Sequence, residues 1–137
     1  MNISAHITLD EATISPTALR MGIDNKPNEE QLANMKLVAE KCFEPIRAWY
    51  GKPLKVNSFF RCDELNKAVK GAPTSQHTKG MAIDFSAGTK AENKKIYDWA
   101  VRNLTAFDQI IWEFGGVWIH ISYSPVKNRM QVFSIGK

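Results

Sequence analysis

The chain has 137 residues, of which 44% are hydrophobic and 23% are charged. These fractions resemble those of average soluble globular proteins, and they exclude an intrinsically disordered chain, a collagen-like chain and a coiled coil. No apolar run approaches the roughly 18 residues that a membrane-spanning helix needs, and the first residues lack the basic and apolar segments of a secretory signal. We therefore expect one soluble domain over residues 1–137, made in the cytoplasm.

The formal net charge is +4, from 18 Lys and Arg against 14 Asp and Glu. The basic residues are spread along the chain and do not form the blocks typical of nucleic-acid-binding tails. We expect a solvated surface, a monomer, and no nucleic-acid or membrane partner. Cys42 and Cys62 are too few for a disulfide framework, so we expect two free, partly buried thiols.

The first half of the chain predicts mainly helices. Short capped turns or helices are expected over 8–13 and 15–19, because Ser followed by Pro is a good helix start. Apolar residues then recur at three- and four-residue steps and predict a long helix over 29–50. Pro45 is expected to kink this helix, because it lacks a backbone donor. A strand over 54–60 follows.

The second half mixes both element types. After a short helix over 63–69, the composition of residues 71–80 predicts a loop. The remaining expected elements are a strand over 81–86, a helix from 89 to about 104, and strands over 108–114, 117–123 and 130–135. Helices mixed with antiparallel hairpins predict an α+β fold, with a small antiparallel sheet packed against helices.

Gly115 and Gly116 predict a two-residue turn between strands 108–114 and 117–123. In that register Glu113 faces Trp118 and Ile111 faces His120. Side chains alternate along a strand, so these four residues share one face with Ser122, whereas the other face is apolar: Ile110, Trp112, Ile119 and Ile121. The Glu113 carboxylate then lies diagonally from the His120 imidazole, roughly 7–8 Å away between backbones, near enough for both to act at one centre.

The same alternation places Asp84 on the small and polar side of strand 81–86. An acid between bulky apolar neighbours is costly unless it has a strong partner. His77 lies in the preceding loop, and Gly80 permits a sharp turn into the strand. With His120 these residues form a two-histidine, one-carboxylate set, which is the pattern of catalytic zinc with a fourth position open for water.

Simpler roles stay open on spacing alone. His120 is also compatible with a hydrogen-bonded core histidine, and Asp84 with a helix cap or an ion-pair partner. Glu113 is compatible with a solvated residue of the hairpin. The remaining histidine, His6, fits no part of the pattern, and we assign it an ordinary structural role.

Three segments resemble the signature blocks of the zinc D-alanyl-D-alanine carboxypeptidase-like peptidases. They are Ser-Phe-Phe-Arg at 58–61, Ser-Gln-His-Thr-Lys-Gly-Met-Ala-Ile-Asp at 75–84 and Trp-Ile-His-Ile-Ser at 118–122. That family includes phage endolysins and shares its core with lysostaphin-type peptidases and the hedgehog signalling domain. The resemblance covers the chain from about residue 9 to residue 123.

The resemblance implies a zinc metallopeptidase that hydrolyses the peptide stem or cross-links of bacterial peptidoglycan. It implies that His77, Asp84 and His120 bind one Zn²⁺ ion, and that Arg61 holds the substrate carboxylate or polarises the scissile carbonyl. Ser75, Gln76 and Trp118 are the residues expected to contact substrate. Such a protein acts at the cell wall, and a phage lysin released by a holin is compatible with the expected lack of a signal.

One position departs from the family pattern. Many members place the general base two or three residues before the last ligand, where this chain has Val117 and Trp118, and neither side chain accepts a proton. The hairpin face nominates Glu113 as the base instead. Two other functions stay open: a catalytically inactive zinc-containing module that binds cell wall or protein, and a basic metal-dependent nuclease. For the nuclease, only Lys79 and Arg61 lie near the histidines as phosphate-binding groups.

Overall fold

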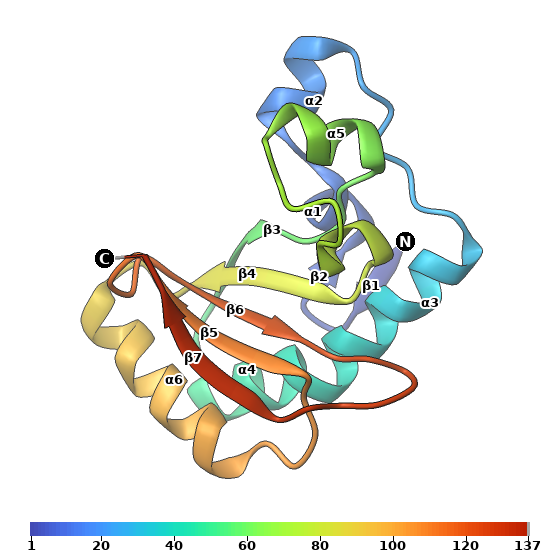
Figure 1. Cartoon of the computed structure of the whole chain (residues 1–137). Helices are drawn as coiled ribbons and strands as arrows, with labels where there is room; N and C mark the ends of the chain where they lie inside the picture. Colours follow the sequence, from blue (N-terminus) through green and yellow to red (C-terminus); the bar gives the residue numbers. More distant parts are fainter. Residues whose placement is uncertain (137) are drawn as a thin grey trace.

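A five-stranded sheet forms the centre of the protein (Figure 1). The structure is a computed structural model and describes residues 1–136. The sheet has the order β3-β4-β6-β5-β7, with β3 at Lys55–Ser58, β4 at Ala82–Ser86, β5 at Gln109–Glu113, β6 at Trp118–Ser122 and β7 at Gln131–Ile135. Neighbouring strands are antiparallel, except that β7 runs parallel to β5. The predicted α+β class is confirmed, and the last strand makes the sheet mixed.

Helices α3, α4 and α6 lie along one side of this sheet, whereas α2 and α5 lie together away from it (Figure 1). The helices are α1 (Leu9–Thr13), α2 (Pro16–Met21), α3 (Glu29–Val38), α4 (Glu44–Tyr50), α5 (Asp63–Ala68) and α6 (Lys90–Asn103). A separate hairpin of β1 (Asn2–Ser4) and β2 (Ile7–Thr8) precedes them. Strands this short carry little alternation, so the sequence did not predict them.

Polar side chains cap the N-termini of the helices at the expected residues. Ser15 Oγ accepts a 3.2 Å hydrogen bond from the backbone N–H of Ala18, with Pro16 in the first turn. Asn28 and Gln31 form a reciprocal capping box at the start of α3, each side chain accepting a 2.8 Å bond from the other residue's N–H. These bonds satisfy backbone donors that have no partner within the helix.

The predicted kink at Pro45 takes a different form. Helical structure continues from α3 to α4, but Ala39–Phe43 form a π-helical turn, and Pro45 lies in the first turn of α4. A proline lacks the N–H donor and its ring crowds the carbonyl one turn earlier. The wider turn just before Pro45 accommodates both features, so the irregularity precedes the proline.

The core lies between the helices and the sheet face predicted to be apolar. On the sheet side Ile83, Phe85, Ile110, Ile119 and Ile121 are buried, and on the helix side so are Met35, Val38, Phe43, Ile46, Ile96 and Ala100. The predicted pairing of Ile111 with His120 and of Glu113 with Trp118 is also confirmed, although the turn between the strands spans residues 114–117 and not the two glycines alone. Asp84, Glu113 and His120 therefore lie on the opposite face of the sheet, away from these helices.

The two cysteines are free thiols, as predicted. Cys62 is half-buried, but Cys42 is entirely buried in the core, and burial raises its pKa to about 12. Its thiol is therefore protonated at neutral pH and packs as an apolar group. Among residues 1–136, no helix combines the length and the apolar character needed to cross a membrane.

The segment predicted as a loop over 71–80 contains a short 3₁₀ helix, η2, at Gln76–Lys79. Ser75 begins it, and Gly80 ends it with a φ of +74°. A Cβ atom at Gly80 would lie 2.5 Å from the carbonyl oxygen of Gln31 in α3. Glycine is therefore required here both by the backbone conformation and by the close approach of α3.

Candidate metal centre

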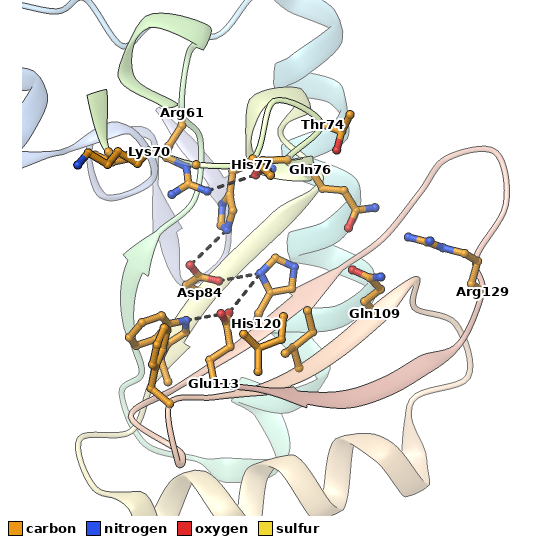
Figure 2. Close-up of a pocket in the computed structure, with 18 residues that line it drawn as sticks. Arg61, Lys70, Thr74, Gln76, His77, Asp84, Gln109, Glu113, His120 and Arg129 are labelled. Carbon is orange, nitrogen blue, oxygen red and sulfur yellow. Dashed lines mark hydrogen bonds and ion pairs between the residues drawn. The ribbon is translucent and has the colours of Figure 1, made fainter. Parts of the chain in front are cut away.

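The face of the sheet opposite the helices brings three ionisable side chains together. Asp84 of β4 and His120 of β6 are direct cross-strand partners. On the next strand, β5, Ile111 pairs with His120, and Glu113 follows two residues later on the same face. His77 comes from η2, which lies over this face (Figure 2). Strand pairing thus fixes two of the three groups of the predicted metal set, and the 3₁₀ helix supplies the third.

The predicted set converges on one point. One ligand atom each from His77, Asp84 and His120 lies within 4.8 Å of the others, which is a spacing that could hold a metal ion. His77 Nε2 is 3.2 Å from Asp84 Oδ2, and His120 Nδ1 is 2.9 Å from Asp84 Oδ1 (Figure 2). All three side chains are largely shielded from solvent.

The hydrogen bonds around His77 test whether a cation fits this point. Its Nδ1 lies 2.7 Å from the carbonyl oxygen of Phe59, which only accepts, so Nδ1 carries the proton. In the neutral imidazole, Nε2 then presents a lone pair toward the Asp84 carboxylate. Nε2 is buried and makes no hydrogen bond within residues 1–136. Two electron-pair donors that face each other in a buried site suit a divalent cation between them. The Phe59 carbonyl binds the other ring nitrogen and so fixes the orientation of the imidazole, as a hydrogen-bond partner of a metal-binding histidine usually does.

Asp84 is ionised despite its burial. Burial by itself raises the pKa of this carboxyl group, but the neighbouring imidazoles of His77 and His120 outweigh that effect and hold the pKa below its ordinary value. A carboxylate that stays ionised is the form that binds a metal ion.

Glu113 lies beside the centre. Its Oε2 accepts a 3.0 Å hydrogen bond from Trp118 Nε1 and is 3.8 Å from His120 Nδ1. Burial and the negative charge of Asp84 raise the pKa of Glu113, whereas His120 and the Trp118 hydrogen bond oppose the rise. A carboxylate with a raised pKa next to a metal centre has the properties of a proton acceptor and donor.

Arg61 and Ser75 form the other wall of the centre. Arg61 Nη2 donates a 3.2 Å hydrogen bond to Ser75 Oγ, which also accepts from the backbone N–H of His77 at 3.3 Å. Burial lowers the pKa of Arg61, while Asp84 and Glu113 raise it. Arginine stays charged under such shifts, so a cation faces the centre. Ser75 thus positions both the guanidinium and the turn that carries His77.

The predicted site residues all line one pocket, with a volume of about 630 Å³. They are Arg61, Ser75, Gln76, His77, Asp84, Glu113, Trp118 and His120. His6 lies elsewhere, with its Nδ1 2.6 Å from Glu44 Oε1, in keeping with an ordinary structural role.

Sequence reasoning missed other residues of the pocket wall, among them Lys70, Gln109, Phe114, Arg129 and Ile135. The alternation along β5 already implied Gln109, which lies on the same face as Ile111 and Glu113. No sequence signal indicated Arg129, because it comes from the loop between β6 and β7.

Asp108 links the two sides of the pocket from below its surface. Its buried carboxylate accepts a 2.8 Å hydrogen bond from Gln76 Nε2, and Arg129 donates from Nε, Nη2 and its backbone N–H at 2.7–2.9 Å. The Arg129 hydrogen bonds hold the pKa of Asp108 at about 2, although burial raises it and Gln76 adds a smaller lowering effect.

Comparison with protein families agrees with this geometry. Residues 5–122 match the family model described as Peptidase M15. The match includes every residue of the His77, Asp84 and His120 set, together with Arg61 and Glu113. A comparison with curated proteins found no match. Because the family model covers most of the 137 residues, the chain belongs to the Peptidase M15 family of metallopeptidases.

Proposed function

We propose that this protein is a zinc-dependent peptidase that hydrolyses amide bonds in the peptide stem or cross-links of bacterial peptidoglycan. The observation that carries the proposal is the convergence of His77 Nε2 and His120 Nδ1 on the two oxygens of Asp84 in the wall of a pocket. In this proposal these three side chains bind one Zn²⁺ ion. Two imidazoles and one carboxylate suit zinc, since they leave a coordination position open.

When bound, zinc supplies Lewis-acid chemistry, which makes a water molecule acidic near neutral pH and polarises a carbonyl group. Glu113 is the proposed general base. It takes one proton from the attacking water as the new carbon–oxygen bond forms, and it delivers that proton to the nitrogen as the carbon–nitrogen bond breaks. The Trp118 hydrogen bond holds the carboxylate in place for both transfers.

Arg61 is proposed to bind the substrate carbonyl or a substrate carboxylate. Within residues 1–136 its guanidinium donates one side-chain hydrogen bond, to Ser75, so further donors are uncommitted. Ser75, Gln76 and Trp118 would shape the pocket around the bond to be cut, since all three line it. The cations Arg61, Lys70 and Arg129 on the wall suit a peptide that carries carboxylates, such as the stem of the bacterial wall.

The proposal is tested with purified peptidoglycan and soluble stem peptides, incubated with protein that has been stripped by a chelator and reloaded with zinc. We expect release of peptide fragments that stops on chelation and returns with zinc. Mass spectrometry of the fragments identifies the bond and separates carboxypeptidase from endopeptidase action. Stoichiometric zinc binding without fragment release would instead identify an inactive zinc-containing binding module at the cell wall.

The cellular setting belongs to the same proposal. A peptidase of this kind acts at the cell wall, and a phage lysin released through a holin would fit. We also expect a monomer, which the mass measured by light scattering in the presence of zinc would test.

A further inference from the structure

We infer that Arg129 is a substrate-binding residue that holds a carboxylate on the side of the scissile bond away from Arg61. The inference rests on the proposed function, and it adds the class of substrate: a peptide with an acidic group on the Arg129 side. Arg129 lies beyond residues 5–122, the part of the chain that the family model matches. The residue comes from the loop between β6 and β7.

The two arginines lie on different sides of the same pocket (Figure 2). Both line the pocket, Arg61 at the His77 side and Arg129 at the far side, beyond His120 and Gln109 (Figure 2). Figure 2 shows the Arg129 guanidinium reaching from the β6–β7 loop back toward Gln109 and His120. A peptide whose amide bond lies at the centre would therefore extend past Arg129 on one side only.

The side chain of Arg129 is held by hydrogen bonds to Asp108. Its Nε and Nη2 donate to Asp108 at 2.9 and 2.7 Å, and the carboxylate that receives them is buried. These bonds use one edge of the guanidinium and fix its plane. The Arg129 side chain is 49% exposed, so its remaining donors are open to a ligand. A guanidinium that is fixed on one edge and exposed on the other is preorganised for a carboxylate.

The Asp108 carboxylate also connects this arginine to the metal centre. It accepts a 2.8 Å hydrogen bond from Gln76 Nε2, and Gln76 directly precedes His77. The same buried group thus sets the position of Arg129 and of the residue beside a proposed zinc ligand. Because Arg129 and Asp108 nearly cancel in charge, we expect recognition through hydrogen-bond geometry more than through long-range attraction.

The test uses pairs of stem peptides of identical sequence, in which each carboxylate in turn is either free or converted to a carboxamide. For one such carboxylate, the zinc-loaded protein should prefer the free acid by about tenfold in kcat/KM, mainly through KM, as expected for one charge-assisted hydrogen bond. Arg129→Gln should abolish most of this preference. Arg129→Lys keeps the positive charge but loses the paired N–H donors of the guanidinium, so it should retain part of the preference for the free acid.

Arg102→Gln, at an exposed arginine near the end of α6, is the matched control and should keep the full preference. Calorimetric binding of the same peptides to zinc-free protein gives a second readout, and thermal unfolding shows that the variants fold. An Arg129→Gln protein that folds and still prefers the free acid as strongly as wild type overturns the inference. An equal loss of kcat/KM for the free-acid and the carboxamide peptide also overturns it, because the Arg129–Asp108 pair would then have a structural role only. If zinc-loaded wild type cleaves no peptide, the proposed function fails, while the binding comparison still decides the role of Arg129.

Discussion

The indole Nε1 of Trp118 donates a 3.0 Å hydrogen bond to Oε2 of Glu113, its direct partner across β5 and β6. The side-chain contacts described for Glu113 all use Oε2, including the 3.8 Å approach to His120 Nδ1. The second oxygen, Oε1, is therefore uncommitted. A carboxylate held by one oxygen and free at the other is well placed to accept a proton in the pocket.

Glu113→Gln should lower turnover by roughly 10²–10⁴-fold, the usual contribution of general acid–base catalysis, because the amide cannot accept the proton. Zinc should stay bound at one ion per chain, as measured by atomic absorption. Glu40 is an exposed acid that does not line the pocket, so Glu40→Gln is the control and should behave as wild type. Loss of zinc together with activity would mean that Glu113 is a ligand or a structural residue.

His120→Ala should remove zinc and activity together, since it deletes one of the three proposed ligands, whose ligand atoms lie within 4.8 Å of one another. His6→Ala is the matched control, because His6 contacts Glu44 and lies outside the pocket. That variant should keep one zinc ion and full peptidase activity. Metal content after dialysis and thermal unfolding with and without zinc measure both effects. Stoichiometric zinc in folded His120→Ala protein would contradict the ligand assignment.

Gly80→Ala should destabilise the protein and weaken zinc binding, because the new Cβ would meet the Gln31 carbonyl oxygen at 2.5 Å and displace η2. Gly51→Ala separates this contact from the cost of the backbone conformation. Gly51 has the same φ of +74° but nothing within 4 Å of the added atom. A positive φ costs about 1–2 kcal/mol in either variant. Gly80→Ala should therefore unfold at a clearly lower temperature than Gly51→Ala, and equal melting temperatures would argue against the close approach.

Asp108→Asn should make stability less sensitive to acid. The hydrogen bonds from Arg129 lower the pKa of Asp108 from 3.8 to about 2 in the folded protein. The stabilisation is then complete above the unfolded pKa and is lost as the pH falls from about 4 toward 2. Solvent screening at the half-exposed Arg129 keeps this stabilisation small.

Urea unfolding of wild type and Asp108→Asn at a series of pH values measures this effect. The difference in the free energy of unfolding should be constant near neutral pH and should shrink below pH 4. A difference that stays the same down to pH 2 would show that the ionised carboxylate is not the source of the stability.

The local pattern was sufficient for the sheet around the site. Alternation along the strands predicted that Glu113 and His120 share a face and that Asp84 lies on the polar side of its own strand, and the two glycines of the hairpin predicted the pairing of Glu113 with Trp118, which the structure confirms. These inferences depend on neighbours in the chain or directly across a turn, whereas the pairing of Asp84 with His120 joins β4 to β6. Residues with a period of two and a short turn leave little freedom in register.

In the helix predicted over 29–50, the local sequence did not predict the position of the irregularity. Proline predicted an irregularity at Pro45, but the structure places it one turn earlier, as a π-helical turn at Ala39–Phe43 that accommodates the missing donor and the proline ring. The parallel pairing of β7 with β5 depends on contacts between segments distant in the sequence.

The sequence by itself determined part of the chemistry of the centre: that Glu113 and His120 share a face of the hairpin, and that a strand acid such as Asp84 needs a partner. Only the tertiary structure decided what surrounds it. The buried Asp108 connects a residue of η2 with an arginine of the β6–β7 loop, and α3 closes on Gly80. These contacts join irregular segments, whose paths follow from long-range packing and hydrogen bonding and leave no periodic signal in the sequence.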